Sequence, residues 1–441
     1  MAVKIVDAIM GTGKSTAAIN YINEQCASRK IMYVTEYLPE AKRIAQACPR
    51  AHMLEPREEL SISGSSKTQH LRSLIADGAN VACSHALFRW CPEDILADIK
   101  RQNYIVIIDE VINVFEDADL SVGDVEFLLS ADAVTRTALD EDGDIILYEL
   151  NPEKQFAVKQ LRPLFNKLGR QPILQIREIE ERKNAKAKLY SKQWMLPKEL
   201  FEVSDDIFIL TYLFDGSPLS SFLQLSGVEV EHWCVTRRNG TLTFGTSDPY
   251  VPSYVCDIKN KLHVCRDEKR NAIGDKYEAL SVNWYKRERK PAEKVKLNKL
   301  RSNVRWFMRE CKDVPKHSPD ERMWSCFSQG EKFVVDKGYT NASVPFNKKA
   351  TNELRGRKVL AYCANVFAKP GLKKFCELYG VAYNEDEFAL STLVQWIWRS
   401  AIRDGEEVWL YVPSSRMRDL LDAWLDEVSS GVVTGYQKHQ H

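Results

Sequence analysis

Short apolar runs alternate with segments of helical period over roughly the first quarter of the chain. The apolar runs predict β-strands at 3–9, 31–35, 80–83 and 104–108. Helical spacing between these runs predicts helices over 14–28 and 39–47. The run at 104–108 is continuously apolar, which is typical of a strand buried on both faces of a parallel sheet. Strands that alternate with helices predict a doubly wound α/β domain.

The middle of the chain has a weaker pattern. Residues 115–205 are mostly polar and helical in character, with strand-like pieces at 145–149 and 188–195. An apolar run at 206–211 predicts another buried strand. From 227 to 275, Val, Thr, Tyr and Gly alternate, and Asn239-Gly240 is a pair well suited to a hairpin turn. This last stretch predicts a small β-rich connector or insertion.

A second α/β unit is predicted near the C-terminal end of the chain. Its clearest helix spans about 292–311, where apolar residues recur at helical spacing. Strand-like runs lie at 323–327, 333–335, 343–346, 358–363 and 407–412, and a helix is expected near 392–403. The expected organisation is therefore a first domain over 1–226, the connector over 227–275 and a second domain over 276–441.

A Gly-rich turn follows the first predicted strand. Its residues are Gly11, Thr12, Gly13, Lys14, Ser15 and Thr16, preceded by Ala8 in an A-x-x-G-x-G-K-S pattern. Glycines allow backbone N–H groups to curl around phosphate oxygens, and the helix that follows adds the positive end of its dipole. Lys14 is placed to reach β- and γ-phosphates, and the Ser15 hydroxyl to bind Mg²⁺. The pattern predicts a nucleoside triphosphate site.

Two polar motifs end other predicted strands. Asp109 and Glu110 follow the strand at 104–108, where an Asp holds Mg²⁺ and a Glu orients or deprotonates the attacking water in phosphoryl transfer. An ordinary polar strand end is the alternative. Thr211 and Tyr212 end the strand at 206–211, in a place that resembles the Ser/Thr motif by which helicases link nucleotide state to the second domain. A buried strand end with a satisfied hydroxyl is the alternative.

Three polar residues late in the chain form a further candidate site. Gln395, Arg399 and Arg403 are spaced i, i+4, i+8, which would place them on one face of the predicted helix. A Gln followed by two arginines suits an arginine-finger helix that stabilises charge on a transferring phosphoryl group. The alternative is a solvated basic face.

Candidate nucleic-acid contacts are of two kinds. Thr35, Ser84 and His85 end predicted strands at the edge where a parallel sheet binds its ligands, although capping roles are equally open. Residues 286–309 contain ten basic and two acidic residues, with the pair Trp284-Tyr285 just before them and the pair Trp306-Phe307 near their end. Such a stretch either tracks a phosphate backbone with its aromatics stacked on bases, or forms a solvated helix with aromatics in the core.

Composition adds limits on class and compartment. The chain has 441 residues, 44% hydrophobic and 28% charged, enough for two or three globular domains. The net charge of +1 predicts no partner, but residues 109–149 hold thirteen acidic residues and one basic residue. The eleven cysteines form no C-x-x-C pair, which favours reduced thiols. No signal peptide or membrane-spanning run is evident, so a cytoplasmic protein is expected.

The order of these motifs resembles superfamily 2 DEAD/DEAH-box-like DNA helicases of the phage and prophage type, over nearly the whole chain. The matching segments are Ala8 to Ser15 for motif I, Val34 to Glu36 for motif Ia, Asp109 to Ile112 for motif II, Leu210 to Ser217 for motif III, Met323 to Phe327 for motif IV, 347–352 for motif V and Gln395 to Arg403 for motif VI. Through motif V, the resemblance adds Thr351 and Asn352 as candidate nucleic-acid contacts. Two departures are Val111-Ile112 at the end of motif II and Trp398 where many relatives have Gly.

The resemblance implies two RecA-like P-loop NTPase domains, ATP and Mg²⁺ as cofactors, and nucleic acid, most simply DNA, as partner. The expected function is an ATP-dependent DNA helicase or translocase acting in phage-type replication, recombination or repair. The alternatives are an origin-binding or remodelling ATPase that does not unwind, a P-loop kinase and, more remotely, a packaging motor. A kinase would have a single α/β domain with a lid, and would leave Gln395 to Arg403 unexplained.

Overall fold

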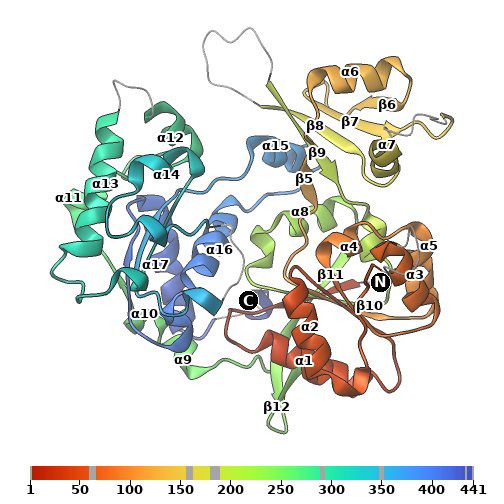
Figure 1. Ribbon diagram of the computed structural model, residues 1–441, viewed down its shortest axis with the longest axis horizontal. Coiled ribbons are helices and arrows are strands. Elements are labelled where there is room, and N and C mark those ends of the chain that lie inside the picture. Colours follow the sequence, from red (N-terminus) through yellow and green to blue (C-terminus); the bar gives the residue numbers. More distant parts are fainter. Residues whose placement is uncertain are drawn as a thin grey trace. The chain divides into compact units, whose positions relative to one another are not determined.

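The computed structural model describes residues 2–58, 66–154, 162–178, 189–288, 294–346, 352–432 and 435–439 (Figure 1). It forms two compact units, each built from several chain segments. The first unit contains residues 1–7, 15–247 and 368–383, and the second contains 8–14, 248–367 and 384–441. Among the described residues, no helix combines the length and apolar character that crossing a membrane requires.

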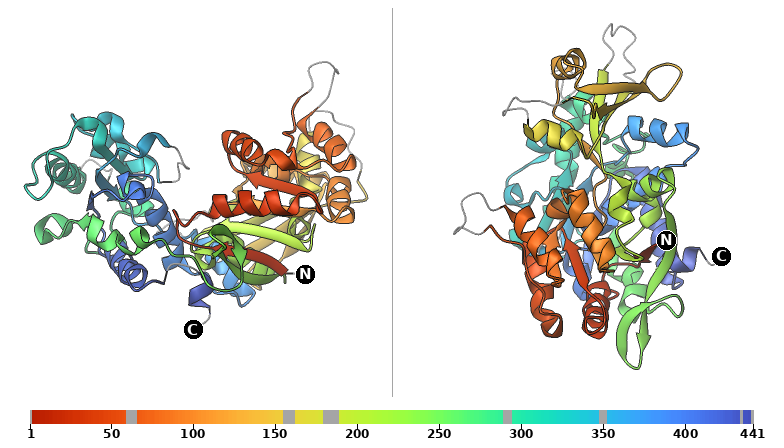
Figure 2. Two further views of the ribbon diagram at one scale, coloured as in Figure 1. Left: turned by 90° about the horizontal axis from the view of Figure 1, so that it is seen from below. Right: turned by 90° about the vertical axis from the view of Figure 1, so that its right-hand side faces the viewer.

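The first unit is organised around a seven-stranded sheet of order β12-β11-β1-β10-β4-β2-β3. All neighbouring strands are parallel except the pair β11 and β12. The strands are β1 (Ala2–Asp7), β2 (Ile31–Thr35), β3 (Val81–Ser84), β4 (Ile105–Asp109), β10 (Asp206–Thr211), β11 (Glu229–Arg238) and β12 (Thr241–Gly245). Figure 2 shows this sheet and its helices from two further directions. The central strands are buried along almost their whole length, which explains why they have no polar alternation.

Helices connect the strands of this sheet. They are α1 (Lys14–Gln25), α2 (Leu38–Ala47), α3 (Lys67–Ala76), α4 (His85–Arg89), α5 (Glu93–Arg101) and α8 (Pro218–Leu225). Parallel strands require such crossovers, because the chain must return to the same edge before the next strand begins. The strands predicted at 3–9, 31–35, 80–83, 104–108 and 206–211 all form, with bounds that agree to within two residues.

A second, antiparallel sheet is inserted between β4 and β10, and its order is β5-β9-β8-β7-β6. Its elements are β5 (Phe115–Asp117), α6 (Val122–Ser130), β6 (Val134–Ala138), β7 (Ile145–Leu150), α7 (Arg162–Leu168), β8 (Ile173–Glu178) and β9 (Leu189–Met195). One face of the sheet packs with α6 and α7 around a core that includes Val125, Ile146 and Trp194. The predicted helical character of 115–205 is therefore wrong except at α6 and α7, whereas the strand-like pieces predicted at 145–149 and 188–195 are confirmed as β7 and β9. Cross-strand pairing supplies the apolar contacts, and those pairs join residues too far apart for a local pattern to reveal.

The helix α15 (Pro370–Leu378) belongs to the first unit, although it follows a strand of the second unit in sequence. It packs on β8, where a Cβ at Gly371 would lie 2.7 Å from the Ile176 side chain (Figure 1). Lys374 pairs with Asp140 at 3.5 Å and with Asp144 at 3.1 Å. The inserted sheet therefore holds a chain segment from a distant part of the sequence.

The second unit contains a four-stranded parallel sheet of order β13-β16-β15-β14. Its strands are β13 (Leu262–Val264), β14 (Arg322–Cys326), β15 (Val359–Cys363) and β16 (Val408–Tyr411). The helices are α9 (Ser253–Cys256), α10 (Ile258–Lys261), α11 (Glu268–Asn271), α12 (Val282–Glu288), α13 (Lys294–Arg309), α14 (Ser328–Val334), α16 (Glu385–Ile397), α17 (Ser415–Ser429) and α18 (Gly435–Lys438). The prediction of an α/β fold with two units built on parallel sheets is confirmed.

Several local predictions differ from the structure. The strand expected at 333–335 lies at the end of α14 and beyond it, and at 343–346 only Ser343 forms an isolated bridge, with Trp324. The hairpin predicted at Asn239-Gly240 forms, with φ of 50° and 81° at its two central residues. The hairpin, however, extends the first sheet through β11, and β13 joins the second sheet, so residues 227–275 form no separate β structure.

Candidate functional site

The Gly-rich loop connects the end of β1 with Lys14, the first residue of α1. Gly11 and Gly13 have φ of 85° and 87°, a left-handed conformation that side chains disfavour. The buried Thr12 hydroxyl donates to the Ile9 carbonyl at 2.8 Å, which closes the turn. The Lys14 ammonium donates to the carbonyls of Ala8 and Ile9 within the same loop. This is the strand–loop–helix arrangement in which backbone N–H groups and a lysine can surround phosphate oxygens.

Gly11 belongs to the second unit, as do Tyr254 and Trp398, and it lies close to both. The Tyr254 hydroxyl donates to the Gly11 carbonyl at 2.7 Å. A Cβ at Gly11 would lie 2.4 Å from that hydroxyl oxygen and 3.1 Å from Cζ2 of Trp398. Conformation and space therefore both require glycine at this position.

Asp109 is held by two neighbouring elements of the first unit. The Tyr33 hydroxyl, in β2, donates to Asp109 Oδ2 at 2.8 Å. His85 Nε2, at the start of α4, lies 2.9 Å from the Asp109 carbonyl. Because a carbonyl oxygen only accepts, this contact places the hydrogen of a neutral His85 on Nε2. Sequence reasoning missed Tyr33; a polar hydroxyl within the apolar run 31–35 was the available signal.

Glu110 has a φ of 68°, which is uncommon for a residue with a side chain. Its N–H donates to the Leu210 carbonyl of β10 at 2.9 Å, so the main chain leaves β4 while still bonded to the adjacent strand. A residue held in the left-handed region costs about 1–3 kcal/mol, and such residues cluster at functional sites.

Asp7, the last residue of β1, was not recognised from the sequence. Its side chain is 2% exposed, and its two carboxylate oxygens accept from the N–H groups of Leu213 and Phe214 at 2.9 and 3.0 Å. These two residues follow Thr211 and Tyr212, both buried, at the end of β10. Asp7 therefore fixes the chain that follows β10 against the end of β1.

The candidate nucleic-acid residues have mixed surroundings. Thr35 is 3% exposed and pairs with Ser84 across β2 and β3. The Ser84 hydroxyl accepts from the Leu87 N–H at 3.2 Å and so caps α4. Thr351 and the side chain of Asn352 lie outside the described residues. The structure thus supports a capping role for Ser84 and does not test the nucleic-acid assignments.

The basic region 286–309 is largely the helix α13, and its apolar side faces the core of the second unit. Trp284, Tyr285 and Phe307 are all buried in that core. The sequence left open whether these three rings stack on bases or lie in the core. The structure places them in the core, so the base-stacking alternative is wrong for them. Trp306 is partly exposed, and the Arg270 guanidinium lies 4.8 Å from the centre of its ring.

Gln395, Arg399 and Arg403 do not share one helical face, contrary to prediction. The helix α16 ends at Ile397, and a short 3₁₀ turn follows at Ala401–Asp404. Ser400 causes the break: its hydroxyl donates to the Ile397 carbonyl at 2.6 Å and accepts from the Ile402 N–H. Arg399 is 8% exposed and donates to the Phe346 carbonyl at 3.3 Å, whereas Arg403 is exposed.

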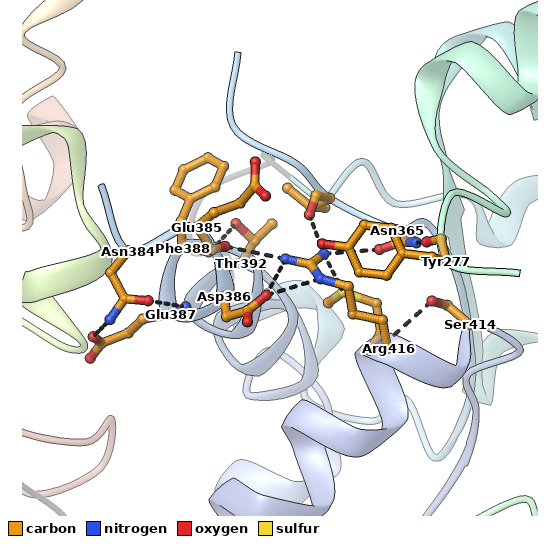
Figure 3. A network of polar contacts seen from close by, with 12 residues as sticks. Tyr277, Asn365, Asn384, Glu385, Asp386, Glu387, Phe388, Thr392, Ser414 and Arg416 are labelled. Carbon is orange, nitrogen blue, oxygen red and sulfur yellow. Dashed lines mark hydrogen bonds and ion pairs between the residues drawn. The ribbon is translucent and has the colours of Figure 1, made fainter. Parts of the chain in front are cut away.

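A buried arginine holds the start of α16 (Figure 3). Arg416 donates to Asp386 at 2.6 Å and, at 3.0 Å, to Asn365, which follows β15. Its guanidinium also lies 4.5 Å from the centre of the Phe367 ring. All these partners of Arg416 belong to the second unit. Arg416 therefore has a structural role, which the sequence pattern did not indicate.

Two side chains of the first unit are of the types that bind a magnesium ion. Ser15, the second residue of α1, and Asp109 offer hydroxyl and carboxylate oxygens, which are the ligands that Mg²⁺ prefers. The first N–H groups of α1 have no acceptor within their own helix, as at the start of any helix. The donor set therefore suits a nucleotide phosphate with its metal.

Fold and loop together define an α/β protein of two parallel-sheet units with a Gly-rich loop after its first strand. The chain is 30% identical over 430 residues to the SPbeta prophage-derived uncharacterized protein YonV of Bacillus subtilis (strain 168), covering 96% of this chain and 98% of YonV. It therefore belongs to the YonV family. Residues 256–425 match the YonV C-terminal Rossmann-like domain.

Two solved structures share a distant likeness with this chain. The structure of S. tokodaii Xpd4 gives a TM-score of 0.45 at 10% identity and covers 96% of this chain and 94% of its own. The DUF1998 helicase MrfA bound to DNA and AMPPNP gives a TM-score of 0.32 at 10% identity, covering 97% of this chain and 48% of its own. Similarity at this level does not define an activity.

Replacing Asp7 with Ala should lower the free energy of unfolding by about 2–6 kcal/mol, because two buried N–H groups lose their acceptor at about 1–3 kcal/mol each. Urea denaturation of the full chain measures this change. Asp142→Ala, at an exposed position, serves as the control and should change stability by less than about 0.5 kcal/mol. Indistinguishable urea midpoints for the two variants would contradict the role of Asp7.

Gly11→Ala should destabilise the chain by about 1–2 kcal/mol from its backbone conformation alone, and by more if Tyr254 must move. Gly123→Ala in α6 is the matched control, because a Cβ there meets open space beyond Ser121 Oγ at 3.8 Å. Thermal unfolding should show a lower midpoint for Gly11→Ala and an unchanged or higher one for Gly123→Ala. A Gly11→Ala variant as stable as the wild type would show that the loop tolerates a side chain.

Proposed function

We propose that this chain is an ATP-dependent DNA helicase or translocase of the superfamily 2 type, acting in phage-type replication, recombination or repair. One observation carries the proposal. A loop with two left-handed glycines and a lysine joins β1 to α1. In the same sheet as β1, strand β4 ends at Asp109, and Glu110 follows it. Loop, lysine and acidic strand end are the parts from which P-loop NTPases build their sites. The prophage origin of the relative YonV supports the phage setting.

Each residue of this set has a proposed task. The N–H groups of Gly11 to Ser15 and the Lys14 ammonium bind the β- and γ-phosphates. Ser15 and Asp109 hold Mg²⁺, which when bound neutralises charge on the phosphates. The Glu110 carboxylate orients the attacking water and takes its proton. Thr16, the third residue of α1, adds a second hydroxyl group beside Ser15 for binding the nucleotide.

Gln395, Arg399 and Arg403 are proposed to act on the transferring phosphoryl group, with Arg399 as the principal cation. Residue type and the resemblance of this segment to motif VI support the assignment. Thr35, Ser84, His85, Thr351 and Asn352 are proposed to contact nucleic acid on the same ground. The second parallel-sheet unit favours an enzyme with two α/β domains over a small P-loop kinase.

A second candidate function is an ATPase that binds or remodels DNA without separating strands. The specific observation is Ile112, an apolar residue at 1% exposure in the position where helicase relatives carry a coupling acid or imidazole. A buried isoleucine offers no polar contact through which hydrolysis and strand movement are linked. Strand separation measured beside ATP hydrolysis and DNA binding distinguishes the two functions.

Lys14→Ala should lower the rate of DNA-stimulated ATP hydrolysis about 100-fold or more, because the phosphates lose a preorganised positive charge. The measurement is phosphate release by the full chain, titrated with single-stranded, duplex and branched DNA and with RNA. Lys100→Ala is the control: this exposed lysine lies in the last turn of α5, just before β4 begins. Full activity in Lys14→Ala would refute the assignment of the loop.

Arg399→Ala should lower kcat about 1,000-fold while nucleotide affinity is nearly kept, as expected for a cation that acts on the transition state. Because Arg399 is 8% exposed, unfolding must be measured in parallel. Arg355→Ala, an exposed arginine paired with Asp404 in the same unit, is the control. A folded Arg399→Ala variant with wild-type kcat would remove this residue from the catalytic set.

A further inference from the structure

Tyr33 places a hydroxyl group inside the first sheet, beside the carboxylate at the end of β4. Its side chain is fully buried, and its hydroxyl donates to Asp109 Oδ2 at 2.8 Å. Tyr33 pairs with Ile107 across β2 and β4, and Ile107 lies on the same face of β4 as Asp109. The ring therefore spans the diagonal between neighbouring strands, a distance that aromatic side chains can cover.

The hydroxyl is a permanent donor. Burial, followed by the charge of Asp109 and the hydrogen bond to it, raises the pKa of Tyr33 well above its usual value near 10. The contact itself defines the hydroxyl as the donor, because an ionised carboxylate only accepts hydrogen bonds. Asp109 thus receives a neutral, fixed donor, and no other charge is introduced beside it by Tyr33.

The main chain of Asp109 is fixed as well. His85 Nε2 holds its carbonyl from α4 at 2.9 Å, and the Glu110 N–H is bonded to β10. With the backbone held on both sides, the direction of the Asp109 carboxylate is set by its side-chain torsions and by contacts such as the one from Tyr33. The hydrogen bond from Tyr33 restricts the rotation of the Asp109 carboxylate.

We propose that Tyr33 is a positioning residue for the proposed magnesium site: its hydroxyl fixes the Asp109 carboxylate in the orientation that binds the metal. This inference rests on the function proposed above. Hydrogen bonds to a ligating carboxylate orient it, and losing such an outer partner typically costs about 10–100-fold in metal affinity. Tyr33 itself contacts neither metal nor nucleotide.

The test compares Tyr33→Phe with Tyr104→Phe in the full chain. Tyr104 is the matched control, because it is also fully buried in the first unit and its hydroxyl donates to a backbone carbonyl, that of Ala79, at 2.8 Å. Tyr104 immediately precedes β4, at the opposite end of the strand from Asp109. Each variant loses one buried hydrogen bond, so both should lose similar stability.

Metal affinity is measured directly, by electron paramagnetic resonance titration of Mn²⁺ in the presence of ADP. Tyr33→Phe should bind Mn²⁺ about 10-fold more weakly than the wild type, and Tyr104→Phe equally well. ADP affinity in EDTA should be the same for all three proteins. The Mg²⁺ concentration that gives half-maximal ATP hydrolysis should rise by a similar factor in Tyr33→Phe alone.

The outcomes separate this inference from the function on which it rests. Equal Mn²⁺ affinity in wild type and Tyr33→Phe would overturn the positioning role while leaving the ATPase assignment intact. An equal loss in both variants would also overturn it, since a general loss of packing would then be the cause. A wild-type chain that binds neither ADP nor Mn²⁺ would overturn the proposed function, and the positioning role with it.

Discussion

The insertion of β1 between β10 and β11 is the constraint on which the first unit depends. The chain's first strand pairs in parallel with two strands that lie more than 200 residues later, in a register that sets Asp7 opposite Thr211. The inserted antiparallel sheet separates β4 from β10 in sequence, and α8 separates β10 from β11. Because neighbouring parallel strands end at the same edge of a sheet, the C-terminal ends of β1, β10 and β4 lie side by side.

Buried polar groups then fix the chain where the strands end. Asp7 accepts two N–H groups from the segment after β10, while Tyr33 and His85 bond to Asp109 from β2 and α4. A buried polar group without a partner is costly, so each of these contacts restricts the position of two elements at once. The same reasoning applies to Arg416 in the second unit, where one guanidinium connects α17, α16 and the end of β15. Geometry at the strand ends is thus determined by a few hydrogen bonds.

The inserted antiparallel sheet shows how a remote segment is captured. Its face opposite α6 and α7 receives α15, a helix that follows β15 in sequence but belongs to the first unit. Gly371 allows the close approach to Ile176, and Lys374 meets two carboxylates of the acidic stretch. Two of the acidic residues between 109 and 149, Asp140 and Asp144, therefore form ion pairs inside the first unit.

The sequence by itself determined the strands of the main sheet, the Gly-rich loop and the hairpin at Asn239-Gly240, because each is encoded by a continuous local pattern. It failed over most of 115–205 outside β7 and β9, where the strands are stabilised by distant partners, and at Ser400, whose hydroxyl ends a helix that periodicity alone would continue. Only the tertiary structure decided that Tyr33, His85 and Asp7 are hydrogen-bonding partners at the strand ends. Those contacts join residues 24 to 207 positions apart, and such distances have no signature in a local pattern.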